Sequence, residues 1–176
     1  MMKKILGVVG LLLLLLLAFA ATRPDTFRVE RSATIKAPPE KVFAYLNDFQ
    51  KFGEWSPWEK LDPAMQRTFS GPATGVGSVY GWSGNDDVGV GRMEIKSLEP
   101  NARVTIQLDF LKPFEAHNTT DYLLQAGTDG KTTVTWAMHG PMPYISKLMG
   151  VFVSMDALVG KDFEQGLANL KAVAEK

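Results

Sequence analysis

The alternation of apolar and polar residues at a period of two constrains the fold of this chain more than any other feature of its sequence. Val104, Ile106 and Leu108, for example, are each flanked by polar residues, which is typical of a strand with one buried face and one face in water. Strand-like segments occur near residues 26–36, 66–70, 76–82, 88–98, 102–110, 114–125 and 131–140. Turn-forming residues separate the later segments, so the sequence predicts consecutive antiparallel strands joined by tight turns.

The spacing of apolar residues changes to three and four near the C-terminus. The residues at this spacing are Met155, Leu158, Val159, Phe163, Leu167, Leu170 and Ala174. Charged residues occupy the opposite side, which predicts an amphipathic helix over residues 156–175. Two short helices are expected after the first strand, one beginning at Pro38-Pro39 and one near residues 48–53, and a further short helix at about 144–153. The predicted fold class is therefore α+β, with a curved antiparallel sheet of about seven strands wrapped around the long C-terminal helix.

The N-terminal segment differs in composition from the rest of the chain. Lys3 and Lys4 precede an unbroken apolar stretch from Ile5 to Ala21, the arrangement of a signal peptide or of an N-terminal membrane anchor. The sequence Ala18-Phe19-Ala20 would suit a signal peptidase, but the stretch is longer than the usual apolar region of a signal peptide, which favours a retained anchor. Because both lysines precede the stretch, the positive-inside rule directs the remainder of the chain out of the cytoplasm.

The remainder of the chain has the size of one domain. Residues 23–176 contain no internal repeat, no low-complexity stretch and no block of like charges that would indicate a linker between domains. We therefore expect a signal peptide or membrane anchor at residues 1–22, followed by a single domain at 23–176. This domain should lie in the cell envelope outside the cytoplasm, on a single-pass anchor if the segment is retained, and periplasmic or secreted if it is cleaved.

Composition excludes several classes of function. The 19 Lys and Arg residues balance the 19 Asp and Glu residues, so the chain lacks the basic excess on which nucleic-acid binding rests. The chain has no Cys and only two His, which excludes thiolate metal sites and iron–sulfur clusters. The segments Gly75-Val76-Gly77 and Gly89-Val90-Gly91 do not complete a dinucleotide-binding motif. Neither a metal nor an organic cofactor is expected.

Two long segments carry a resemblance to a known family. The segment FRVERSATIKAPPEKVFAYLNDFQKFGEWSPWE and the ending HGPMPYISKLMGVFVSMDALVGKDFEQGLANLKAVAEK, together with the order of elements, resemble the SRPBCC superfamily, in particular its polyketide cyclase/dehydrase-type branch with a START-like helix-grip fold. The resemblance covers nearly all of residues 26–176. It implies a deep cavity between the sheet and the C-terminal helix, which different members use for lipids, hormones or polyketides. It names no universal catalytic residue, so none is carried over to this chain.

Strand parity places mainly apolar and aromatic side chains on the sheet face that the long helix covers. The tyrosines and tryptophans among them are the stronger pocket candidates, because each has a polar tip that could bond a ligand. The candidate ligand-binding residues are Trp55, Trp58, Tyr80, Trp82, Met93, Ile95, Ile106, Phe110, Asn118, Tyr122, Trp136, Met138, Met142 and Phe163. Asn118 and Thr120 share the parity of Tyr122 and could bond a ligand or face water at the rim. The alternative is that most of these side chains fill an ordinary core.

Acid–base residues are scarce on the inner face. Parity puts His117, His139, Glu94 and Asp109 on the outer face, so neither an inward His nor an inward pair of carboxylates is expected. The residues of the strands therefore give little support to an enzymatic function.

The loop Trp55-Ser56-Pro57-Trp58-Glu59 is the most suggestive irregular segment. Its two indoles could line the mouth of a pocket, or they could plug one end of the sheet. Glu59 is its one charged group, and with Tyr80 and Tyr122 it completes the set of residues that could transfer a proton if the domain is an enzyme.

Three functions are consistent with these patterns. The favoured one is extracytoplasmic binding of a small hydrophobic ligand, lipid-like or polyketide-like, between the sheet and the C-terminal helix, with the 55–59 loop and the 141–153 segment as its gate. The second is a cyclase/dehydrase-type enzyme acting on an apolar substrate in the same cavity. The third is a ligand-free interaction module of the envelope. The expected partners are a small apolar ligand and, through a retained N-terminal segment, the membrane, but no nucleic acid.

Overall fold

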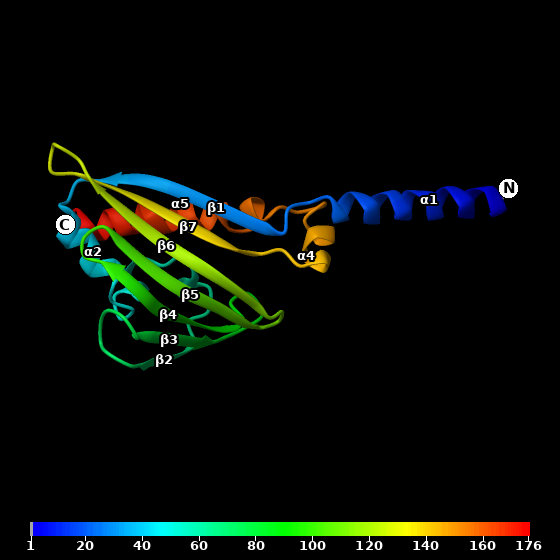
Figure 1. Ribbon diagram of the computed structural model, residues 1–176. Coiled ribbons are helices and arrows are strands. Elements are labelled where there is room, and N and C mark those ends of the chain that lie inside the picture. Colours follow the sequence, from blue (N-terminus) through cyan, green and yellow to red (C-terminus); the bar gives the residue numbers. More distant parts are fainter. Residues whose placement is uncertain (1) are drawn as a thin grey trace.

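Seven antiparallel strands form one curved sheet in the computed structural model, which describes residues 2–176 (Figure 1). The strands are β1 (Thr26–Ile35), β2 (Gln66–Ser70), β3 (Val79–Ser83), β4 (Val90–Glu99), β5 (Arg103–Lys112), β6 (Ala116–Ala126) and β7 (Thr132–Pro141). Their order across the sheet is β1-β7-β6-β5-β4-β3-β2, so β2 to β7 form the predicted meander. β1 pairs with β7 along its whole length, from Thr26 opposite Pro141 to Ile35 opposite Thr132.

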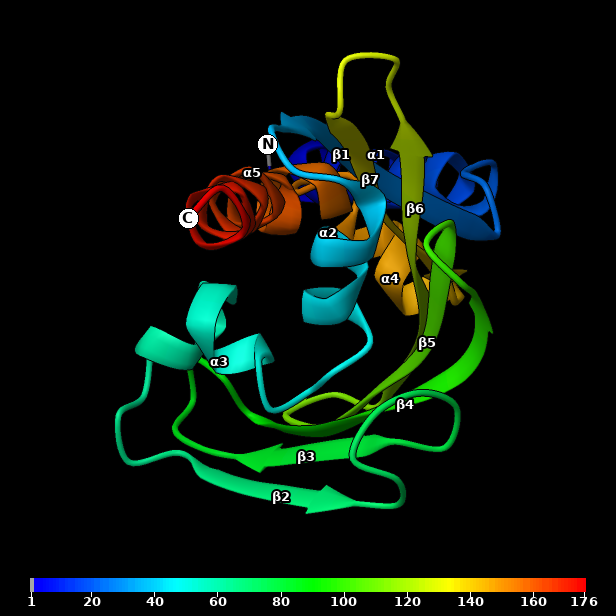
Figure 2. The ribbon, with the colours of Figure 1, turned by 90° about the vertical axis from the view of Figure 1, so that its left-hand side faces the viewer.

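The helices lie at one face and one end of this sheet. They are α1 (Met2–Ala21), α2 (Pro39–Leu46), α3 (Phe52–Trp55), α4 (Tyr144–Met149) and α5 (Met155–Ala174), with a 3-10 turn η1 (Trp58–Lys60). Figure 2 views α5 along its axis and shows the sheet curving around the side on which α2, α3 and α5 lie. α1 projects away from the body of the protein (Figure 1). The predicted α+β class and helix-grip fold are confirmed.

Three elements are shorter than the sequence predicts. The short helix expected near residues 48–53 is α3, which spans only Phe52–Trp55. β3 begins at Val79 rather than at residue 76, because Gly75 and Gly77 adopt φ angles of 84° and 85°, which a strand does not contain. α4 ends at Met149 rather than at residue 153. The chain has to turn there to begin α5, whose first turn is capped by the Ser154 hydroxyl, which accepts a backbone N–H bond of 3.1 Å.

α5 buries one face against the concave side of the sheet. Phe163, Leu167 and Leu170 are at most 2% exposed, and burying a side chain of this size contributes about 1.5–3 kcal/mol. The polar side of the helix is fixed to β1, because the Arg31 guanidinium donates hydrogen bonds to Asp156 and to Glu164, each 2.7 Å long. The long helix therefore lies along the sheet with most of its apolar residues inward, as its spacing predicts. The exception is Leu158, which the spacing placed on the apolar face but which is 57% exposed.

The outer face of the sheet carries a polar network. His117 bonds Asp109 (2.8 Å) and His139 bonds Asp121 (3.3 Å), so neither imidazole faces the concave side. Asp121 lies on the outer face as parity predicts, yet it is only 3% exposed. Arg103 and a neighbouring threonine donate to its carboxylate and cover it. The long side chains of the adjacent strands thus bury the Asp121 carboxylate, which strand parity alone would place in water.

Among the helices in residues 2–176, only α1 is long and apolar enough to cross a membrane. Ala20 is the one buried residue of α1, so the apolar surface of this helix is left uncovered. Residues 22–25 connect it to β1. Both a signal sequence and a membrane anchor would have this appearance.

Candidate functional site

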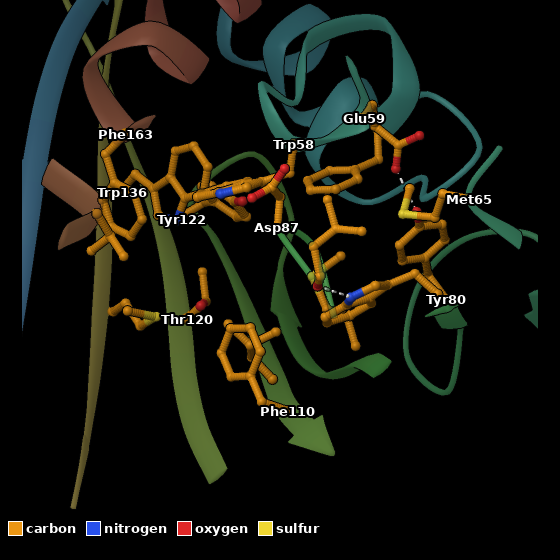
Figure 3. Close-up of a pocket in the computed structure, with 17 residues that line it drawn as sticks. Trp58, Glu59, Met65, Tyr80, Asp87, Phe110, Thr120, Tyr122, Trp136 and Phe163 are labelled. Carbon is orange, nitrogen blue, oxygen red and sulfur yellow. Dashed lines mark hydrogen bonds between the residues drawn. The ribbon is translucent and has the colours of Figure 1, made fainter. Parts of the chain in front are cut away.

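A cavity of about 200 Å³ lies between the concave face of the sheet and the helical segments α3, η1 and α5 (Figure 3). The residues that line it are Phe52, Trp58, Glu59, Met65, Tyr80, Trp82, Asp87, Val88, Met93, Leu108, Phe110, Thr120, Tyr122, Trp136, Met138, Val159 and Phe163. The lining is largely apolar and aromatic. The volume is below the roughly 300–1,000 Å³ of pockets for drug-sized ligands, but it exceeds the about 150 Å³ that suffices for benzene.

Many residues that sequence parity placed on the inner face meet in this cavity. Trp58, Tyr80, Trp82, Met93, Phe110, Tyr122, Trp136, Met138 and Phe163 all line it, and so does Glu59. They come from five strands and two helical segments, which explains why no single motif in the sequence identifies the site. Their role in holding a ligand stays a prediction.

The other candidate residues lie outside the cavity wall. Trp55 is 2% exposed and packs edge-on against Tyr122 and Trp136, with ring centroids 5.9 and 5.5 Å away. Ile95 and Ile106 are fully buried core residues. The remaining two, Asn118 and Met142, are absent from the lining, and both lie near backbone glycines at the end of the sheet where β7 stops. Of the two indoles in the 55–59 loop, one therefore closes the core and only Trp58 reaches the cavity.

Thr120, which parity offered as an inward polar residue, also lines the cavity. Several other lining residues were absent from the sequence-based set: Phe52, Met65, Asp87, Val88, Leu108 and Val159. Leu108 and Val159 have the inward parity of their strand and helix, so the sequence held a signal for both. Three others, Met65, Asp87 and Val88, lie in connections between elements. Neither the strand period of two nor the helix spacing of three and four applies there, so only the folded structure shows where these side chains lie.

An aromatic cluster forms the wall of the cavity at α5 and β7. The rings of Trp136 and Phe163 stack at 4.2 Å with an interplanar angle of 9°. Trp58 meets both edge-on, at 5.7 Å and 6.3 Å, and Tyr122 lies 5.2 Å from Trp136. Aromatic pairs of this geometry add about 0.5–1.5 kcal/mol each beyond their burial. This wall is therefore rigid and offers flat apolar surfaces to a bound molecule.

Two hydroxyl-bearing side chains line the β6 side of the cavity. Tyr122 is 2% exposed and Thr120 is 3% exposed, and both line the cavity from the same face of β6 (Figure 3). Within the described residues, the buried side-chain atoms that lack a hydrogen-bond partner are Nε1 of Trp55, Oγ of Ser56 and Nε1 of Trp136. Burial raises the pKa of Tyr122 well above its usual value, so the phenol stays protonated and able to donate. These groups can bond one polar atom of a ligand.

A carboxylate with two partners lies on the opposite side. Arg67 donates to the Glu59 carboxylate with an Nε–Oε2 distance of 2.6 Å, and the Tyr80 hydroxyl donates to the other oxygen. The Glu59 side chain is 8% exposed. Burial, and then the hydrogen bond to Glu59, raise the pKa of Tyr80, so this phenol is also protonated at neutral pH. The group combines an ionic pair with a proton held between two oxygen atoms.

Metal ligands do not gather in the described part of the chain: residues 2–176 contain no group of three or more His, Asp or Glu side chains arranged to hold a metal ion. The residues of the cavity wall are apolar, aromatic or hydroxyl-bearing, apart from Glu59 and Asp87.

Known structures share this architecture. The Zhui aromatase/cyclase from a Streptomyces species superimposes with a TM-score of 0.61 at 14% identity, over 85% of this chain and 94% of that one. A protein from Mesorhizobium loti gives 0.56 at 22% identity, over 84% and 97%. DynU16, a protein of the dynemicin biosynthetic locus, gives 0.55 at 19% identity, over 88% of this chain and 48% of its own. At these identities the likeness is one of fold.

Sequence comparison adds the family. No curated protein matches the chain. The family model described as polyketide cyclase / dehydrase and lipid transport matches residues 26–175, which is the whole domain from β1 to the end of α5. The curved sheet, the long C-terminal helix and the apolar cavity between them agree with that match, and the chain belongs to the polyketide cyclase/dehydrase and lipid transport family.

Proposed function

We propose that this protein binds a small hydrophobic molecule in the cavity between its sheet and α5, outside the cytoplasm. The observation that carries the proposal is an apolar cavity of about 200 Å³ whose wall also includes the hydroxyl-bearing side chains of Thr120 and Tyr122. A hydroxyl that faces an apolar cavity can donate a hydrogen bond to an oxygen atom of a ligand.

The cavity limits the chemistry of the ligand. Its size suits a molecule of one or two rings or a short chain rather than a complete phospholipid. The aromatic wall favours a flat or unsaturated apolar body. A carbonyl or hydroxyl oxygen on the ligand would bond Tyr122. Since Glu59 is already neutralised by Arg67, a neutral ligand fits better than a charged one.

The proposed location rests on the N-terminal segment. Lys3 and Lys4 precede the apolar helix α1, which supports an N-terminus in the cytoplasm and a domain at residues 23–176 outside it. Retention of α1 as a single-pass anchor is the form of the proposal that we favour, because the apolar stretch is long for a cleaved signal.

The binding proposal is tested by native and denaturing mass spectrometry of residues 23–176 and by uptake of the neutral dye N-phenylnaphthylamine. We expect a co-purified apolar passenger or saturable dye binding. Val159→Phe, which fills the cavity from α5, should weaken dye binding at least about tenfold, while Leu158→Phe, on the exposed side of the same helix, should leave it unchanged. Neither passenger nor dye uptake in the folded domain would contradict the proposal.

A second candidate function has one observation in its favour. The Tyr80 hydroxyl donates a hydrogen bond to Glu59 at the cavity wall, and a hydroxyl–carboxylate pair of this kind could serve an acid–base step of a cyclase or dehydrase. An enzyme of this kind would return its passenger cyclised or dehydrated, whereas a binding protein returns it unchanged. Mass spectrometry of a ligand before and after incubation distinguishes the two, with Tyr80→Phe as the variant that should abolish conversion only.

A further inference from the structure

Exposed apolar side chains gather at the end of the domain where α1 joins it. The residues of this 144–153 patch are Tyr144, Ile145, Met149, Phe152 and Val153. Ile145 and Phe152 are 62% and 73% exposed, although both are large and apolar. A cluster of such side chains on a water-soluble domain marks a surface that is covered by something else.

The patch is held against α1 by specific bonds. The Tyr144 hydroxyl donates to the backbone carbonyl of Leu17 in α1 (3.0 Å). Asp25, in the connection after α1, accepts a backbone bond from Met142 (2.6 Å) and an ionic hydrogen bond from Lys147 of α4. Leu17 lies about 6 Å along the helix axis before Ala21. The patch therefore lies beside the last turn of α1.

A second chain segment brings apolar residues to the same end. β1 begins at Thr26 opposite Pro141, and the β5–β6 turn lies between paired Phe110 and Ala116. Since β6 runs antiparallel to both β5 and β7, this turn is at the end of the sheet where β7 stops and β1 starts, which is also the end that carries α4 and α1 (Figure 1). The exposed residues that it adds are Leu111 and Phe114.

We propose that the 144–153 patch, together with Leu111 and Phe114, docks onto the surface of the lipid bilayer that α1 crosses. The proposal rests on the retained anchor described above. Apolar side chains of interfacial segments enter a bilayer by about 5–10 Å, which matches the depth set by the contact between Tyr144 and Leu17. An aromatic hydroxyl at this level is typical of membrane proteins. Two separate segments that point toward the same end as α1 fit a flat lipid surface better than a second copy of this chain.

The absence of cysteine allows a direct test on the full chain. Single variants Phe152→Cys and Ile145→Cys are labelled with an environment-sensitive fluorophore and reconstituted into phosphatidylcholine vesicles with or without doxyl-labelled lipid. Val76→Cys is the matched control, since Val76 is apolar, exposed and located in the β2–β3 connection, away from α1. We expect doxyl lipid to quench the labels at 145 and 152 by about twofold or more, independently of salt, and to leave the label at 76 unchanged.

Two results would overturn the docking. Labels at 145 and 152 that are quenched by aqueous iodide as strongly as the label at 76 would show that the patch faces water. Labels shielded from iodide but insensitive to doxyl lipid would show that protein, such as a second copy, covers the patch. The anchor is tested separately. Co-flotation with the vesicles shows whether the chain binds membrane, and the mass of the chain isolated from cells shows whether α1 is retained. If the chain floats while the label at residue 152 stays in water, the docking proposal is wrong and the anchor is still supported.

Discussion

At the scale of single residues, Glu59 illustrates how a carboxylate is held in a largely apolar wall. Each of its oxygens has its own partner, because Arg67 bonds one and Tyr80 bonds the other. Arg67 is held in turn by a bond to the backbone carbonyl of Met65 (2.7 Å). The carboxylate is therefore neutralised by one neighbour and hydrogen-bonded by the other, and the removal of either leaves a polar group unmatched.

Arg67→Ala should lower the free energy of unfolding by about 2–3 kcal/mol, because Glu59 would lose its counter-charge while remaining buried; the partial exposure of Arg67 places the loss below that of fully buried pairs. Arg28→Ala is the matched control. Arg28 and Glu30 form an exposed pair, whose loss should cost no more than about 1 kcal/mol. Urea unfolding followed by tryptophan fluorescence measures both, and equal losses would contradict the role assigned to Arg67.

Tyr122→Phe should weaken binding of an oxygen-bearing ligand by up to about tenfold, since one neutral hydrogen bond contributes about 0.5–1.5 kcal/mol. Tyr45→Phe is the control, because the Tyr45 hydroxyl donates to the Val173 carbonyl (3.4 Å) away from the cavity. Titration of each variant with the passenger molecule gives the dissociation constants. An unchanged constant for Tyr122→Phe would mean that the ligand makes no bond to that hydroxyl.

Asp121→Asn should flatten the acid limb of the stability curve. Burial alone would raise the pKa of Asp121, but hydrogen bonds from Thr105 and Arg103 and the charge of Arg103 outweigh it and lower the pKa below 3.8. A lowered carboxyl pKa contributes stability that is present above the unfolded value and is lost as the pH falls through the folded value. The free energies of wild type and variant should thus differ at pH 7 and converge below about pH 4. A constant difference over that range would contradict this assignment.

The residues of the site could be predicted only in part. Glu59, Tyr80 and Tyr122 were identifiable from residue type and strand parity. Arg67 was not, because its contact with Glu59 joins β2 to η1 and depends on how the intervening turn folds. The buried state of Asp121 likewise depends on side chains of adjacent strands, which parity does not reveal.

At the scale of elements, the packing of α5 on β7 depends on a small residue. A Cβ atom added to Gly166 would lie 2.6 Å from Cζ3 of Trp136, the ring that stacks on Phe163 in the cavity wall. The helix can therefore approach the sheet this closely only where it lacks a side chain. The period of apolar residues predicted the inward face of α5 correctly except at Leu158, which is exposed, but it gave no sign of this close approach.

Gly166→Ala should destabilise the domain by up to about 2 kcal/mol, because overpacking against Trp136 costs about 1–3 kcal/mol and the gain in helix propensity offsets only about 1 kcal/mol of that cost. Gly53→Ala in α3 is the control. Its added Cβ would lie 3.8 Å from the nearest atom, a carboxylate oxygen of Glu59, so the change should be neutral or slightly stabilising. Thermal unfolding of both variants and of the wild type measures the two changes in stability. A stable Gly166→Ala variant would show that the indole can move, and that the wall is less rigid than its geometry indicates.

At the scale of the whole molecule, the order and type of the elements follow from two periods of apolar residues, and the family follows from long segments of sequence. The cavity, in contrast, could not be predicted from either of these. Inner-face side chains such as Ile95 and Ile106 have the same parity as Met93 and Leu108, yet the first two are in the core and the others line the cavity. Whether an apolar face closes completely depends on how far the sheet curves and where the helices rest, which are properties of the assembled fold.

The short connection between α1 and β1 has a consequence for how the protein could work. Residues 22–25 reach no more than about 14 Å when extended, and Asp25 is bonded to both Met142 and Lys147. A domain joined so closely to a retained α1 cannot shuttle cargo between two distant membranes. Cargo that is dissolved in the same membrane would reach the domain by lateral diffusion in two dimensions, at a frequency set by the surface density of the protein in the membrane rather than by its concentration in the surrounding volume.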